Sequence, residues 1–132
     1  AIAQLNQEAR IALTLEESQR STESPLRLNS RTMRKIRRSL LTIADTTPIA
    51  CTTGEAAQLI PSPNVCLEIG YALHSKRTEQ ILLARMERKD LSGQFPFDLP
   101  TYQQLEFQDP DRLIEMMPNI LEPMLQRFSL FA

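Results

Sequence analysis

The sequence predicts an α/β domain in which a mostly parallel sheet is flanked by helices. Helix-like and strand-like patterns alternate along the chain, which implies right-handed crossovers between parallel strands. The continuous apolar run Ile81–Ala84 suits a central strand that is buried on both faces. Ser62-Pro63 is a strong helix start, a serine cap followed by proline at the first helical position. With 132 residues, 42% of them hydrophobic, the chain fits one domain over residues 1–132.

The amino-terminal part is predicted to hold two strands and the helices around them. Residues 2–8 have the pattern of the end of a helix, and residues 11–15 alternate as a strand does. Asn29 or Ser30 can cap the next helix, and residues 41–45 follow it as a short buried strand. Domains of this type normally open with a strand, whereas this chain opens inside a helix. We therefore expect the first strand to be missing from the chain or to be supplied by something else.

The carboxy-terminal part is predicted to complete the sheet. Residues 46–61 form a long connection, and residues 62–74 form the helix after it. An edge strand is expected at residues 104–107, followed by a last helix. Pro118 and Pro123 are expected to interrupt that helix, because proline removes a helical hydrogen bond.

Composition narrows the classes of function. The net charge of −1 indicates neither a nucleic-acid nor a membrane partner, and no apolar run approaches the roughly 20 residues that span a bilayer. Cys51 and Cys66 form no CxxC motif, and His74 completes no zinc cluster with them without a further ligand. We therefore expect a cytoplasmic protein with reduced thiols, no metal site and no bound cofactor.

Five residues make up the candidate ligand site. Asp45 ends a predicted strand, and Ser62 and Asn64 begin the next helix, where free N–H groups favour anions. Glu68 lies at the edge of the buried helix face, where partial desolvation favours a perturbed carboxylate. Tyr71 projects near Glu68 and can hydrogen-bond a sugar or a base edge. In open parallel sheets such residues gather outside the carboxyl ends of the strands.

Each of these features also has a purely structural interpretation. Glu68 can be a solvated or capping residue, Asp45 can bond only the loop that follows it, and Gly70 can serve helix–sheet packing instead of a ligand's close approach. One helix carries a cluster of five basic residues that can contact phosphates or form an ordinary solvated face. These residues are Arg31, Arg34, Lys35, Arg37 and Arg38. Spacing alone leaves both interpretations open.

Three blocks of the sequence resemble a known family. They are Ile43-Ala44-Asp45-Thr46-Thr47-Pro48-Ile49, then residues 63–73 (PNVCLEIGYAL), then Phe95-Pro96-Phe97-Asp98-Leu99. In this order they resemble the predicted nucleotide-binding bacterial family that is similar to Toll/interleukin-1 receptor (TIR) domains. Ile69 stands where that family has leucine, and Pro100 stands where it has arginine.

The resemblance implies a flavodoxin-like fold and kinship with nucleoside deoxyribosyltransferases and with TIR enzymes that cleave NAD. In both, a glutamate supports an oxocarbenium-like centre at an N-glycosidic bond. Carried over by position, Glu68 is that carboxylate, Asn64 lies at the ligand-facing helix start and Asp45 at the strand end. NAD or another nucleotide is then a ligand or substrate. The alternative is a nucleotide-sensing or self-associating module without turnover, acting as a homo-oligomer in bacterial defence signalling.

Overall fold

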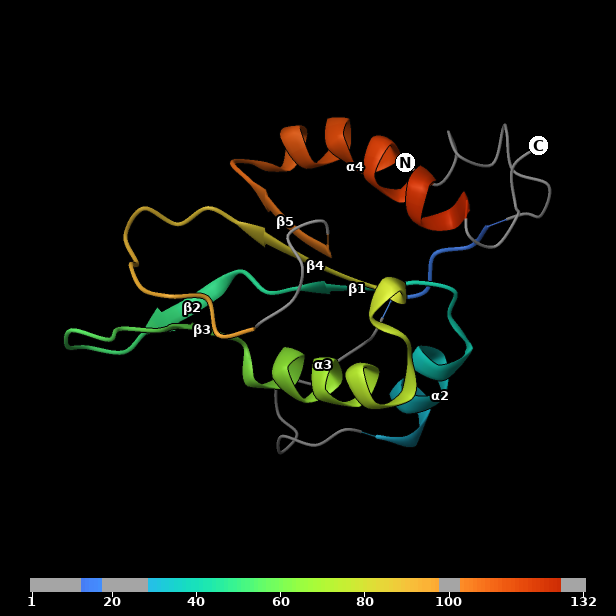
Figure 1. Ribbon diagram of the computed structural model, residues 1–132, viewed down its shortest axis with the longest axis horizontal. Helices are drawn as coiled ribbons and strands as arrows, with labels where there is room; N and C mark the ends of the chain where they lie inside the picture. Colours follow the sequence, from blue (N-terminus) through green and yellow to red (C-terminus); the bar gives the residue numbers. More distant parts are fainter. Residues whose placement is uncertain (1–12, 18–28, 98–102, 127–132) are drawn as a thin grey trace.

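The structure, a computed structural model, describes residues 13–17, 29–97 and 103–126. Its elements form three layers, with α4 on one face of a sheet and α3 with α2 on the other (Figure 1). In chain order the elements are α2 (Ser30–Arg38), β1 (Thr42–Asp45), β2 (Pro48–Cys51), β3 (Leu59–Pro61), α3 (Pro63–Ser75), the short 3-10 helix η1 (Thr78–Gln80), β4 (Ile81–Met86), β5 (Gln104–Phe107) and α4 (Pro110–Gln126).

The main sheet is parallel, in the order β1-β4-β5. Thr42 pairs with Ile81 at the start of β1, and Leu83 pairs with Gln104 where β4 meets β5. The prediction of an α/β fold with a parallel sheet between helices is therefore confirmed, and the arrangement is flavodoxin-like. The apolar run at residues 81–84 forms the central strand as predicted, and all four of its residues are buried.

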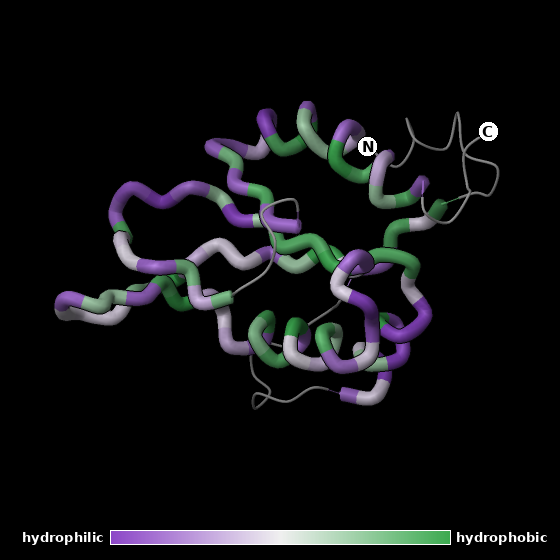
Figure 2. Tube along the Cα trace, viewed as in Figure 1, coloured by the Kyte–Doolittle hydropathy of each residue, from purple (hydrophilic) through white to green (hydrophobic). Residues whose placement is uncertain are grey.

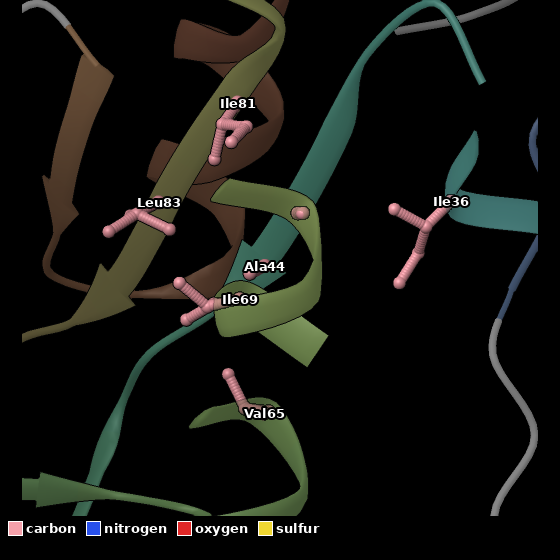
Figure 3. Close-up of a cluster of buried hydrophobic side chains, with 7 residues drawn as sticks. Ile36, Ala44, Val65, Ile69, Ile81 and Leu83 are labelled. Carbon is pink, nitrogen blue, oxygen red and sulfur yellow. The ribbon is translucent and has the colours of Figure 1, made fainter. Parts of the chain in front are cut away.

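Hydrophobic side chains divide into one cluster on each face of the sheet. Because side chains alternate along a strand, Leu82 and Ala84 face α4, whereas Ile81 and Leu83 face α3. On the α3 side, residues from α2, β1, α3 and β4 point toward one another (Figure 3). Figure 2 shows hydrophobic residues along the central strand of the sheet and hydrophilic ones in the connection after β4.

Helix α3 begins at Pro63, as the Ser62-Pro63 pair predicts. Its buried face consists of Val65, Ile69 and Ala72, which are 5%, 1% and 0% exposed. Three side chains at this spacing bury a narrow stripe, and the rest of the helix stays at the surface. The serine at the cap position makes no side-chain capping bond, so the proline and the packing of the stripe determine where the helix starts.

The strand predicted at residues 11–15 is wrong in its described part. Residues 13–15 have no regular structure, and Leu15 is 66% exposed. An alternating pattern forms a strand only where a sheet edge accepts it, and the described sheets consist of β1 to β5 without residues 13–15. Residues 11–12, like the helix end predicted at residues 2–8, lie outside the described residues.

Residues 46–61, predicted as a long connection, contain an antiparallel hairpin. Strands β2 and β3 pair from Pro48 with Pro61 to Cys51 with Leu59, with an irregularity between Pro48 and Ala50. The strands are only 4 and 3 residues long, which is too short for a clear period-2 pattern.

The interruption predicted for the last helix is also wrong. α4 runs without a break through Pro118 and Pro123. Pro118 has no N–H to donate to the carbonyl of Ile114, and Pro123 has none for the carbonyl of Asn119. Ile114 and Asn119 are exposed, so water can satisfy these two carbonyls. Burial of Leu121 and Leu125, each 3% exposed, holds the helix on the sheet.

Candidate functional site

A large hollow runs along the free edge of β1. β4 pairs with one side of β1, and within the described residues no strand pairs with the other. A cavity of about 600 Å³ lies there, walled by residues 13–16, α2, residues 39–44, Glu68 and Ile69 of α3, and Leu121 and Leu125 of α4. Small-molecule sites are commonly clefts of roughly 300–1,000 Å³, so the cavity has the size of such a site.

Glu68 reaches this cavity from the edge of α3. It stands one position before Ile69, which is 1% exposed and anchors the helix on the sheet. The carboxylate is therefore partly buried, in agreement with the helical periodicity. Of the five predicted site residues, all of which the structure describes, Glu68 lines the cavity and the other four do not.

Positive charge from α2 forms the wall across from α3. Helices α2 and α3 pack against each other. Four of the five basic residues of α2 line the cavity. Arg31, Arg34, Lys35 and Arg38 are these four. Arg37 belongs to the same helix and lies outside the lining. Glu16 adds a second carboxylate, which no pattern in the sequence predicted as a site residue. The cavity thus combines cations with carboxylates.

Asp45 ends β1 as predicted but bonds its own neighbour. Its Oδ1 accepts hydrogen bonds from the backbone N–H and the hydroxyl of Thr47, at 3.0 Å and 2.6 Å. The cavity walls reach Ala44 and stop short of Asp45. Asp45 and Glu68 are therefore not brought together around this cavity.

The remaining predicted residues lie around α3. Ser62 and Asn64 are half-buried at its first turn, and neither lines the cavity beside Glu68. Tyr71 is half-buried and packs against the hydrophobic cluster between α3 and the sheet. Cys66, also on α3, is a free cysteine, and burial raises the pKa of its thiol while a backbone hydrogen bond opposes that rise. Its thiol stays protonated at neutral pH, which does not favour a nucleophilic role.

Among residues 13–17, 29–97 and 103–126, no three histidine, cysteine or acidic side chains gather in a way that would hold a metal ion. Within the same ranges, no helix combines the length and apolar composition needed to cross a bilayer.

A smaller cavity of about 200 Å³ lies over β4 and β5 and shares no lining residue with the first. Arg85 is among its lining residues, and it is not one of the predicted site residues. Its signal in the sequence is slight, a cation one position after the apolar run of the central strand.

Comparison of the chain with models of protein families, with curated proteins and with solved structures found no match.

Proposed function

We propose that the protein binds a nucleotide in the cavity along β1 and that Glu68 supports cleavage of its N-glycosidic bond. The observation that carries this proposal is that Glu68 lines the same cavity as four basic residues of α2. Cations on one wall suit the phosphates of a nucleotide, and arginine forks bind phosphate oxygens with two hydrogen bonds. A carboxylate suits the positive charge that develops at the sugar anomeric carbon.

The family resemblance of residues 63–73 supports the same assignment. It gives Glu68 the role of the carboxylate in NAD cleavage or nucleoside transfer. NAD carries both a diphosphate and a nicotinamide–ribose bond, so it is the first substrate to test. A second candidate is binding without turnover, as in a nucleotide-sensing module. The bonds from Thr47 to Asp45 favour this candidate, because they engage the carboxylate that the resemblance puts beside the ligand.

Turnover is tested by incubating the protein with NAD and with nucleosides, beside Glu68→Gln. Free nicotinamide or free base is measured by chromatography. Glu68→Gln keeps the size of the side chain and one acceptor oxygen, and removes its charge. We expect the variant to lose at least 100-fold in rate while the affinity for the nucleotide changes by only a few-fold. Equal background rates in both proteins contradict the enzymatic function. The second candidate, binding without turnover, is then tested by the binding experiment.

Binding is tested by calorimetry with ADP-ribose and with unphosphorylated adenosine. Arg31→Ala combined with Arg34→Ala removes two cations of the cavity wall. Arg37→Ala is the matched control, because Arg37 has the same charge on the same helix and lies outside the lining. We expect the double variant to weaken ADP-ribose at least tenfold, to change adenosine little, and the control to bind as the parent does. Absence of any nucleotide binding contradicts both candidate functions.

A further inference from the structure

The four basic residues of α2 that line the cavity along β1 form one row. They are Arg31, Arg34, Lys35 and Arg38. Counted from Arg31, the others stand three, four and seven positions further along the chain, and this spacing puts all four on one face of the helix. Because an α-helix rises about 1.5 Å per residue, the row extends for about 10 Å along the helix axis. It covers three successive turns, with Arg31 and Arg38 at its two ends.

No described carboxylate forms an ion pair with a cation of this row. Within the described residues, the ion pairs lie between β4 and β5, in the connection after β4 and on α4. Arg31, Arg34 and Arg38 are exposed, and Nζ of Lys35 donates to the neutral backbone carbonyl of Glu17 at 3.0 Å. The cavity lining thus contains four cations and two carboxylates, an excess of positive charge that attracts phosphates.

The spacing of the row limits how phosphates can contact it. Successive turns of a helix are separated by about 5 Å along its axis. The two phosphorus atoms of a diphosphate share an oxygen, so they lie closer together than two turns do and contact one turn of the row. Two phosphates attached to different hydroxyls of one ribose are held apart by the sugar and can contact two turns at once. A ligand that contacts more than one turn therefore has phosphates at two positions of a ribose.

We propose that the nucleotide bound in this cavity carries, besides its 5′ phosphate or diphosphate, a phosphate on the 2′ or 3′ hydroxyl of its ribose. The inference rests on the proposed function, because it takes the cavity along β1 as the nucleotide site, and it narrows the class of ligand. Arginine forks bind each phosphate through two hydrogen bonds, so cations on separate turns hold separate phosphates.

The added phosphate is compatible with the chemistry proposed for Glu68. A 2′-phosphorylated dinucleotide such as NADP has the same nicotinamide–ribose bond as NAD, and its additional phosphate lies on the other ribose. The carboxylate therefore acts at one sugar while the ends of the row contact phosphates elsewhere in the same ligand.

Three isomers test the inference. ADP, adenosine 2′,5′-bisphosphate and adenosine 3′,5′-bisphosphate contain the same atoms and differ in where the second phosphate is attached. Their affinities for the full chain are measured by calorimetry at one salt concentration, because phosphate binding depends on salt. We expect at least one bisphosphate to bind at least tenfold more tightly than ADP, and the tighter of the two identifies the hydroxyl. If ADP binds as tightly as both bisphosphates, this inference is overturned while the proposed function stands. If none of the three binds, the proposed function is contradicted and this inference with it.

Variants at the ends of the row test which cations hold the second phosphate. Arg31→Ala combined with Arg38→Ala shortens the row to its middle turn. We expect this double variant to lose the preference for the bisphosphate and to keep its affinity for ADP within threefold, which also shows that it is folded. Arg37→Ala combined with Lys89→Ala is the matched control, because it removes two exposed cations outside the lining. We expect the control to keep the preference. A preference that survives in the first variant, or that is lost equally in the control, overturns the inference.

Discussion

Thr47 connects Asp45 to the neighbouring strand. It donates two hydrogen bonds to Oδ1 of Asp45, from its backbone N–H and from its hydroxyl, and the same hydroxyl accepts from the backbone N–H of Met86 at 2.8 Å. The carboxylate at the end of β1 therefore orients a hydroxyl that caps the end of β4. This relay gives Asp45 a structural role at the edge of the sheet where ligands of parallel sheets bind.

Asp45→Ala is expected to lower the free energy of unfolding by about 1–2 kcal/mol, because two hydrogen bonds to a charged acceptor are lost at an exposed site. Asp45→Asn retains an oxygen that can accept from Thr47, so its loss is expected to be under about 1 kcal/mol. Urea denaturation measures both. If the alanine variant is as stable as the parent, the relay from Asp45 to Met86 does not stabilise the fold.

Substitution of Gly70 is expected to stabilise the protein, in contrast to substitution of Asp45. The residue is exposed in the interior of α3, and a Cβ built on it meets nothing within 4 Å. No described protein atom therefore approaches Gly70 closely, so packing against another element does not require a glycine here. Gly70→Ala is expected to raise the free energy of unfolding by about 0.5–1 kcal/mol, because alanine is the better helix former. Nucleotide binding is expected to stay unchanged, since Gly70 does not line the cavity of Glu68. A loss of binding or of stability would show that the glycine is required.

The start of α3 and the central strand were predictable because their signals are local. Ser62-Pro63 marks a helix start, and the apolar residues 81–84 mark a strand buried on both faces. The hairpin of β2 and β3 was missed because its strands are short and its pairing joins residues up to 13 positions apart, from Pro48 to Pro61. Residues 13–15 carry an alternating pattern but have no regular structure, so the pattern alone was not sufficient.

The residues of the candidate site also differ in whether a local sequence pattern predicts them. Helical periodicity predicts that Glu68 lies at the edge of the buried face, because this position depends on the residues of α3 alone. Its nearness to the cations of α2 depends on how two helices pack, which the sequence pattern does not encode. Arg85 was missed because its partners, Phe95 and Glu106, come from a loop and from another strand.

Gly93 holds the hairpin against the connection after β4. Its φ is +153°, and a Cβ built on it would lie 2.8 Å from the carbonyl oxygen of Ala57. Next to it, the backbone N–H of Gln94 donates to that same oxygen at 2.9 Å, and the backbone N–H of Leu59 donates to the carbonyl of Gln94 at 2.8 Å. A side chain at position 93 would push these backbones apart.

Gly93→Ala is accordingly expected to destabilise the protein by about 1–3 kcal/mol, since it adds a steric clash to an unfavourable backbone conformation. Gly54→Ala is the matched control, because Gly54 has a φ of +107° but nothing within 4 Å of its built Cβ. We expect the control to lose less stability, about 1 kcal/mol. Thermal denaturation compares the two, and equal losses would mean that the contact with Ala57 does not matter.

Cys66 provides a prediction about pH. Burial raises the pKa of its thiol, so the folded protein holds this proton to higher pH than the unfolded chain does. The stability that Cys66 contributes is therefore fully present below the pKa of the unfolded chain and is lost as the pH rises through the folded pKa. In Cys51→Ser, Cys66 is the remaining cysteine, and its alkylation by iodoacetamide can be followed against pH. We expect the midpoint of the rate profile to lie above that of the same variant in denaturant, with a several-fold slower reaction at neutral pH. Coincident midpoints would mean that the thiol is not desolvated on α3.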